Sequence, residues 1–183
     1  MKNTIKSVAA SALFYWASSV FISHCWAALP VQKIQLANGA LVYWVESPAI
    51  AMLDVQIDVD GGSRRDPVGK AGLASMAAAQ LEKGVVQRGN QSALDENALG
   101  EAWADLGAQF NASASQDGLS FTLRTLTEPD LLAKAVALAA RQIGQPAFND
   151  AIWQRDRQKV VAAIKESDTR PSTVARHDAT CVA

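Results

Sequence analysis

The sequence predicts an α+β fold in which a mixed or antiparallel sheet is covered on one face by helices. Three observations predict it. Extended segments with alternating apolar and polar residues occur in two groups, each group is followed by segments with helical spacing, and two hairpin signals join neighbouring extended segments. The order is three strands, two helices, two strands and two helices. Such grouping is typical of a layered α+β architecture.

The first group of strands contains a hairpin and a longer strand. Asn38-Gly39 stands between two extended runs in residues 31–47, and Asn-Gly in this setting is a strong hairpin signal. Residues 51–60 then alternate strictly, with one side formed by Leu53, Val55, Ile57 and Val59 and the other by Asp54, Gln56, Asp58 and Asp60. This alternation predicts one buried and one solvated face, so we assign no chemistry to the aspartates.

The remaining elements follow in order along the chain. A polar loop, residues 61–70, leads into a helix from about Ala71 to Lys83 that Gly84 closes. The later elements are a helix over 95–106 stopped by Gly107, strands over 108–115 and 119–125, and helices over 129–143 and 150–167. Asp117-Gly118 predicts a hairpin between the last two strands, and Asn149 is placed to cap the final helix.

Residues 1–27 have the pattern of a secretory signal peptide. Lys2 and Lys6 precede an apolar run, and Cys25 and Ala27 occupy the −3 and −1 positions of a cleavage site. The alternative is an uncleaved transmembrane anchor, because the run is nearly long enough to span a bilayer. Polar residues within the run favour cleavage. We therefore expect an exported protein, periplasmic or secreted, with no membrane attachment after cleavage.

Composition excludes several kinds of function for the mature chain. Cleavage removes two of the 17 Lys and Arg and none of the 18 Asp and Glu, which leaves a net charge of −3. A nucleic-acid surface would be basic, so we expect no nucleic-acid partner. Only Cys181 and His177 remain of their types. No intramolecular disulfide can form, and a conventional zinc site lacks most of its ligands.

The loop and helix of residues 61–83 have the outline of an active-site entrance. Gly62 and Gly69 are separated by six residues, whereas a phosphate-binding loop has four, and Ala71 offers no hydroxyl for magnesium. Ser75 is the helix's one hydroxyl, but the G-x-S-x-G pattern of a nucleophile elbow is absent. We expect neither nucleotide binding nor a serine nucleophile, and interpret Ser75 as a small packing residue.

The segment "GGSRRDPVGKAGLASMAAAQLEKGV", residues 61–85, resembles the first active-site segment of the pitrilysin and insulinase metallopeptidases, the inverzincins. Members typically have a G-S-R-x-E/D loop, then G-x-A-H-x-x-E-H and x-F-K-G-T. The resemblance continues through "LGAQFNASAS", "PAFND" and "WQRDRQKVVAAIKES" and covers about Val31 to Thr173. It implies that residues 28–173 are a partial N-terminal lobe of this family, followed by an irregular tail, residues 174–183.

The resemblance also implies that the zinc site is missing. The family's H-x-x-E-H provides two zinc-binding histidines and a glutamate that takes a proton from the metal-bound water. Ser75, Ala78 and Ala79 stand at these positions. The third ligand, a glutamate on a later helix, corresponds to Ala163, with Glu166 as the counterpart if the register is shifted. We therefore expect no zinc, although zinc is the family's cofactor.

A second family feature concerns peptide binding. In relatives, extended substrates pair with an edge strand carrying an N-A-x-T-like sequence, through backbone hydrogen bonds. "FNASAS" is similar to it, with Asn111 and Ala112 at the matching positions and Ala114 in place of the threonine. Extended peptides are thus a possible partner. The alternative is an ordinary edge or inner strand.

These observations lead to a zinc-protease-like protein without peptidase activity. In one version it is a non-catalytic partner of a zinc-bearing family peptidase, since some family enzymes pair such subunits as heterodimers. In the other it is a truncated remnant, because family members continue into a second lobe. The alternative from another class is an active hydrolase that uses Ser75 with His177, or a metal held by Glu166, His177 and Cys181.

Overall fold

The computed structural model describes residues 30–170, which fall into two compact units divided after Ala49. In the first unit, β1 (Gln32–Gln35) and β2 (Leu41–Trp44) form an antiparallel hairpin. Gly39 has a φ of +88°, in the region that favours glycine, so the hairpin predicted at Asn38-Gly39 is confirmed. The expected signal peptide and the tail beyond residue 170 lie outside the described residues.

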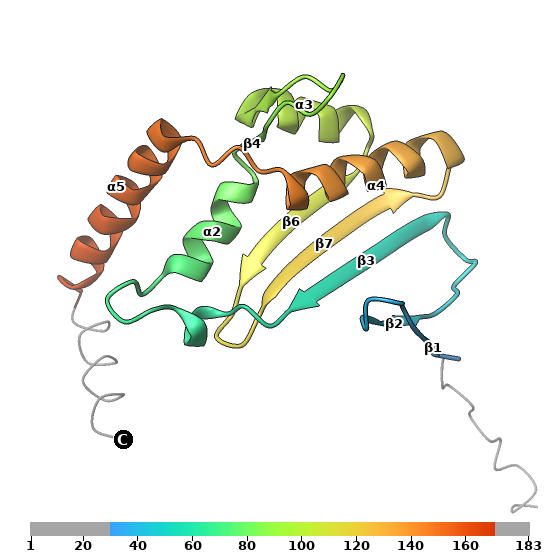
Figure 1. Ribbon diagram of the computed structural model, residues 1–183, viewed down its shortest axis with the longest axis horizontal. Helices are drawn as coiled ribbons and strands as arrows, with labels where there is room; N and C mark the ends of the chain where they lie inside the picture. The colour runs from blue at the N-terminus through green and yellow to red at the C-terminus, as the bar shows by residue number, and fades with distance from the viewer. Residues whose placement is uncertain (1–29, 171–183) are drawn as a thin grey trace, which may run out of the picture. The chain divides into compact units, whose positions relative to one another are not determined.

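The second unit is built on a three-stranded antiparallel sheet with the order β3-β7-β6 (Figure 1). Its strands are β3 (Met52–Val59), β6 (Gln109–Ala114) and β7 (Leu119–Leu126). The hairpin predicted at Asp117-Gly118 joins β6 to β7, with Ser115 N–H donating to the Gly118 carbonyl at 2.8 Å. A separate pair of two-residue strands, β4 (Gly84–Val85) and β5 (Leu94–Asp95), was not predicted, because such short segments show no alternation.

The sheet has one apolar and one polar face, as the alternation predicts. Register pairs Val55 with Leu123 and Phe110 with the same Leu123, so apolar side chains of all three strands share a face. On the opposite face lie Asp54, Gln56 and Asp58 of β3, Ser120, Thr122 and Arg124 of β7, and Gln109, Asn111 and Ser113 of β6. The sheet therefore presents a hydrophilic surface on the side away from its core.

In the part of the chain that the structure describes, four α-helices accompany the sheet: α2 (Leu73–Leu81), α3 (Glu96–Asp105), α4 (Pro129–Gly144) and α5 (Asp150–Ser167). α3 begins where Asp95 caps it, and Asn149 caps α5 as predicted, its Oδ1 accepting Ile152 N–H at 3.3 Å. α2 begins two residues later than predicted, because Gly72 adopts a left-handed φ of 90°. Among residues 30–170, no helix has the length and apolar character to cross a membrane.

The core forms where α3 and α4 pack on the apolar face of the sheet. Leu99 is only 2% exposed and Ala135 is fully buried, and both belong to one cluster with Leu123 of β7. Trp103 stacks on Phe110 of β6 with ring centroids 5.7 Å apart. The buried Trp103 indole N–H donates to Gln142 Oε1 at 2.8 Å, which satisfies the polar atom inside the core.

The loop after β3 docks on the tip of the β6–β7 hairpin. Ser63 N–H donates to the Ser115 carbonyl at 2.9 Å, and Arg64 N–H donates to the Gln116 carbonyl at 3.0 Å. A Cβ on Gly62 would lie 2.4 Å from the Gln116 carbonyl oxygen, closer than van der Waals contact allows. This approach needs glycine, and it fixes the point from which the chain enters α2.

Truncating Leu99 tests the assigned core. Leu99→Ala is expected to lower the free energy of unfolding by about 2–5 kcal/mol, because it leaves a cavity between α3 and the sheet. Val136→Ala removes a side chain that is 44% exposed on α4 and is expected to cost under about 1 kcal/mol. Urea unfolding followed by circular dichroism measures both. Equal losses would mean that the core lies elsewhere.

Candidate functional site

The start of α2 is fixed by a carboxylate from the preceding loop. Asp66 accepts the Gly72 N–H at 2.8 Å and the Ala74 N–H at 3.0 Å. These are N–H groups that the first turn of a helix leaves without a helical partner, and a negative charge there is favourable. Ala74 is buried on the inner side of the helix. The rotation of α2 is therefore fixed at its first turn.

The three positions singled out on α2 lie on neighbouring sides of the helix. Ser75 and Ala79 are one turn apart and both exposed, whereas Ala78 is only 3% exposed. A hydroxyl and two methyl groups offer neither a metal ligand set nor a proton acceptor of useful basicity. Within residues 30–170, no three His, Cys, Asp or Glu side chains are close enough to hold a metal ion together.

The α5 positions that correspond to the family's third zinc ligand can be located relative to Asp156. Gln80 of α2 donates from Nε2 to Asp156 Oδ2 at 3.1 Å, so this side of α5 faces α2. Ala163 lies two turns beyond Asp156 on the same side, and Glu166 lies about 60° from Ala163 round the helix. Glu166 accepts a hydrogen bond from Arg170 at 2.6 Å. His177 and Cys181 lie outside the described residues, so the geometry of the alternative hydrolase sites is not described.

Strand β6 has a free edge next to α2. Ser115 and Gly118 form a hydrogen-bonded pair at the hairpin, and such pairs alternate along an antiparallel ladder. The backbone groups of Phe110, Ala112 and Ala114 therefore point away from β7. No other described strand pairs with this edge. The strand can in principle accept an added strand through these groups.

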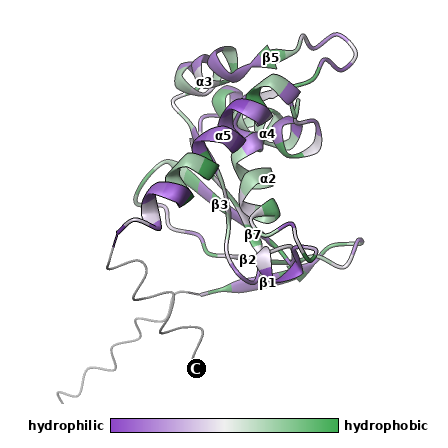
Figure 2. Cartoon of the chain, turned by 90° about the vertical axis from the view of Figure 1, so that its left-hand side faces the viewer, coloured by the Kyte–Doolittle hydropathy of each residue, from purple (hydrophilic) through white to green (hydrophobic). Residues whose placement is uncertain are grey.

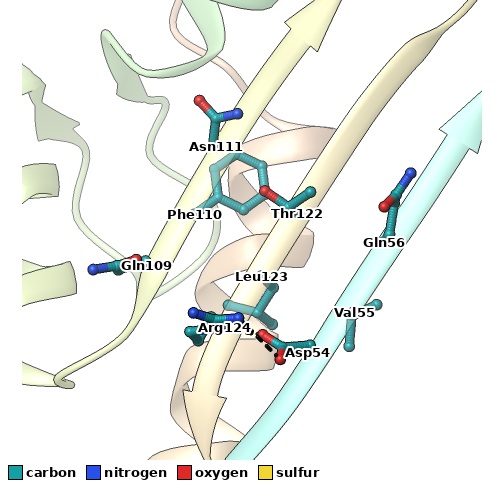
Figure 3. A pocket seen from close by; sticks show the side chains of 9 residues that line it. All are labelled: Asp54, Val55, Gln56, Gln109, Phe110, Asn111, Thr122, Leu123 and Arg124. Atoms are coloured by element: carbon teal, nitrogen blue, oxygen red, sulfur yellow. Dashed lines mark hydrogen bonds and ion pairs between the residues drawn. The ribbon is translucent and has the colours of Figure 1, made fainter. Parts of the chain in front are cut away.

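The two residues predicted to bind peptide, Asn111 and Ala112, lie in different surroundings. The Asn111 side chain is exposed on the polar face of the sheet, where it lines a shallow hollow of about 490 Å³ (Figure 3). Arg124 Nε donates to Asp54 Oδ1 at 2.6 Å in the same hollow, and this bond lowers the pKa of the Asp54 carboxyl. Ala112, in contrast, presents its N–H at the free edge. The group available for a backbone contact with a peptide is therefore the Ala112 N–H and not the Asn111 side chain.

Glu82, directly after α2, contacts the free edge of β6. Its Oε1 accepts the Ala112 N–H at 3.4 Å. Sequence analysis missed this residue, because it lies 30 positions from Ala112 and has no motif of its own. The one feature of the sequence that could have indicated Glu82 is its place at the end of the alanine-rich helix.

A chain of polar contacts joins α2, α3 and α5 beside the site. Glu96 of α3 accepts from Lys83 Nζ at 2.6 Å and from Arg155 Nη2 at 3.1 Å. Arg155 Nε also donates to Asp156 at 2.8 Å, and Asp156 accepts from Gln80 as described above. No residue of α5 is fully buried, so these contacts act together with the half-buried Ile152 and Trp153 at the start of α5.

The same contacts lower the pKa of both carboxyl groups. The Lys83 hydrogen bond is the largest cause for Glu96, followed by partial burial in the opposite direction and the bond from Arg155. For Asp156 the largest cause is the hydrogen bond from Arg155. Both groups are thus held in the charged form that the network requires.

Comparison with known proteins places the chain among peptidase folds. The model of the insulinase family, peptidase family M16, matches residues 41–181. A crystal structure of a peptidase M16 inactive domain from Pseudomonas fluorescens is similar with a TM-score of 0.72 and 30% identity, over 81% of this chain and 34% of that one. No match emerges among curated protein sequences.

More distant structures share the fold. A protease from Helicobacter pylori has a TM-score of 0.64 and 23% identity, over 80% of this chain and 34% of that one. The Escherichia coli periplasmic protease PqqL also has a TM-score of 0.64, with 21% identity, over 79% of this chain and 16% of that one. The chain therefore spans about a third or less of the length of these structures.

The polar network predicts an acid-dependent loss of stability. Because the pKa of Glu96 is lowered from 4.5, its contribution is present above that pH and is lost as the pH falls through the lowered value. Glu96→Gln is expected to cost about 1 kcal/mol at pH 7, a modest value because the side chain is partly exposed. Urea unfolding at pH 7 and at pH 3 measures the difference.

The matched control is Glu101→Gln, which removes an exposed carboxylate of the same helix and is expected to have little effect at either pH. The difference in the free energy of unfolding between wild type and Glu96→Gln should be smaller at pH 3 than at pH 7. A difference that stays constant between the two pH values would contradict an electrostatic role for Glu96.

Proposed function

The chain belongs to the insulinase family of peptidases, peptidase family M16, and we propose that it is a member without peptidase activity that assists a zinc-bearing member of the family. One observation carries the proposal. The helix that provides the catalytic groups in this family holds Ser75, Ala78 and Ala79, while the free edge of β6 lies beside it. In this proposal the catalytic chemistry is lost, while the β6 edge holds an extended peptide.

Peptide hydrolysis in this family needs a metal-bound water and a base. Zinc lowers the pKa of its bound water, and the nearby glutamate takes the proton. Neither alanine can replace these groups, and a single serine hydroxyl binds zinc too weakly to compensate. Even if Glu166 were the third ligand, a lone carboxylate that already binds Arg170 would leave the metal without imidazole ligands. The proposed protein therefore holds no zinc.

Holding a peptide requires no catalytic side chain. An extended segment that adds to a strand edge is bound mainly through backbone hydrogen bonds. The outward groups of Phe110, Ala112 and Ala114 supply such donors and acceptors along β6. Their position beside α2 would place a bound peptide along the helix face that carries Ser75 and Ala79. We propose that the chain contributes this edge to a shared peptide-binding surface.

The proposed partner is a zinc-bearing insulinase-family peptidase, with which the chain forms a heterodimer. The similar Pseudomonas fluorescens structure is described as an inactive domain, which supports the existence of family domains without activity. The signal-like pattern of residues 1–27 supports export, and one structural relative is a periplasmic protease. We therefore place the proposed complex in the periplasm or outside the cell. A remnant without a partner is the competing outcome.

A reconstitution assay tests this function. The mature chain, a zinc-bearing insulinase-family peptidase from the same organism, and their mixture are each assayed on a library of quenched fluorescent peptides. We expect no cleavage by the chain alone, no stoichiometric zinc by elemental analysis, and at least about a tenfold gain in kcat/KM for the mixture, since positioning a substrate can contribute that much.

Two outcomes would contradict the proposal. Hydrolysis by the chain alone that a chelator abolishes, together with stoichiometric zinc, would show a working metal site. A mixture no more active than the peptidase alone would favour the remnant. Ser75→His/Ala79→His serves as positive control for metal detection, because two exposed histidines one turn apart can bind zinc.

Removing the central donor of the β6 edge tests the peptide-binding surface. Ala112→Pro deletes an N–H that points away from β7, so the ladder should survive, as proline is tolerated at outward positions of edge strands. Extended peptides that bind the wild type are expected to bind this variant at least about tenfold more weakly, because the bond is lost and the ring obstructs the edge. Fluorescence anisotropy gives the Kd values.

Gln56→Pro is the matched control. The pair formed by Ala51 and Thr127 is hydrogen-bonded, so the Gln56 N–H also points outward, but from the opposite edge on β3. This variant should bind peptides like the wild type. Thermal melting checks that both variants fold. If Gln56→Pro were the variant that lost binding, the peptide would lie along β3.

A further inference from the structure

Within residues 30–170, Glu82 is the one side chain that forms a hydrogen bond with an outward-pointing backbone group of β6. It follows the last residue of α2 and forms the C-cap of that helix, with its backbone N–H bound to the Ala79 and Gln80 carbonyls. Its carboxylate therefore extends from a fixed backbone position toward β6 and accepts the Ala112 N–H at 3.4 Å. At this length the bond is weak, so the side chain can be displaced.

Glu82 has no cationic partner among residues 30–170. The adjacent Lys83 is bound to Glu96, and its Nζ is 2.6 Å from that carboxylate. Two carboxylates of the sheet and its hairpin have a cationic partner, Asp54 with Arg124 and Asp117 with Arg64, whereas Asp58 of β3 accepts from the Gln56 amide. A half-buried carboxylate whose one described partner is a weakly bound backbone N–H is unusual, because such a charge is stabilised by a close cation.

An extended peptide and Glu82 compete for the same donor. Ala112 is the central residue of the three whose backbone points outward, so a strand added along β6 would offer a carbonyl to its N–H. One N–H cannot serve both acceptors at full strength. The carboxylate must therefore turn away when a peptide binds, and it then needs a new partner at the edge of the groove.

We propose that Glu82 determines which peptides the β6 edge accepts: it disfavours neutral segments and selects segments with a lysine or arginine next to Ala112. The ammonium or guanidinium group replaces the Ala112 N–H as partner of the carboxylate, so the cost of displacing Glu82 is offset only for basic peptides. This inference rests on the proposed role of β6 in holding extended peptides.

The experiment uses the mature chain and matched peptides. A single lysine is placed at each position in turn of an extended decapeptide of alternating valine and threonine, and norleucine replaces it in the neutral series. Fluorescence anisotropy gives the Kd of each. The wild type is expected to bind the best lysine peptide about three- to fivefold more tightly than its norleucine match, the range of a partly exposed charge pair.

Three variants separate the effect of the Glu82 charge from the effect of its hydrogen bond with the Ala112 N–H. Glu82→Gln keeps the shape and the acceptor but not the charge, so the lysine preference should disappear. Glu82→Ala also frees the Ala112 N–H, so it should bind the norleucine peptide at least about threefold more tightly than the wild type, as expected for a neutral hydrogen bond. Glu101→Gln changes net charge equally at an exposed site of α3 and should preserve the wild-type pattern.

The result that overturns the inference differs from the one that overturns the function. Suppose that Ala112→Pro abolishes peptide binding, but that the wild type shows no preference for lysine, or that Glu82→Gln keeps this preference. The β6 edge would then still be the peptide-binding surface, but Glu82 would have no role in selecting peptides. A Glu82→Ala variant no tighter for the neutral peptide would do the same. Absence of binding in both wild type and Glu82→Ala would overturn the peptide-binding edge itself.

Discussion

The placement of β7 between β3 and β6 is the constraint on which the larger unit depends. Because β7 uses its hydrogen bonds on both sides, the apolar residues of three strands share one face and the polar residues the other. α3 and α4 bury the first face through Leu99 and Ala135. The outer side of β6 is left without a strand partner among the described elements, and α2 lies beside it.

Local signals in the sequence predicted much of this arrangement. Asn38-Gly39 and Asp117-Gly118 each determine a hairpin within a few residues, and the spacing of Ser75, Ala78 and Ala79 places them on adjoining sides of one helix. Long-range contacts carry no such signal. Gln80 and Asp156 are separated by 76 positions, and neither stands out as a partner until α5 returns alongside α2. The start of α2 was predicted two residues too early, because the left-handed φ of Gly72 is not evident from the sequence.

The second unit combines two kinds of stabilisation. Apolar packing dominates around Leu99 and Trp103, whereas α5 relies on charged and amide groups from three helices. Figure 2 shows α5 with hydrophilic and hydrophobic turns, and Val160, Val161 and Ile164 are exposed along it. Of the three α2 positions that match the family's zinc motif, Ser75 and Ala79 are exposed, so other side chains fit there without changing the core, whereas Ala78 is buried.

The contact between Gly62 and the β6–β7 hairpin also bears on the order of folding. The hairpin closes over the two residues Gln116 and Asp117, so it can form early from neighbouring segments. The loop of residues 61–65 can dock only on a finished hairpin tip, since its N–H groups need the Ser115 and Gln116 carbonyls in place. Contacts over such long separations form late. We therefore expect α2 to be among the last helices to reach its native position, so that the β6 edge is exposed to the solvent for a period during folding.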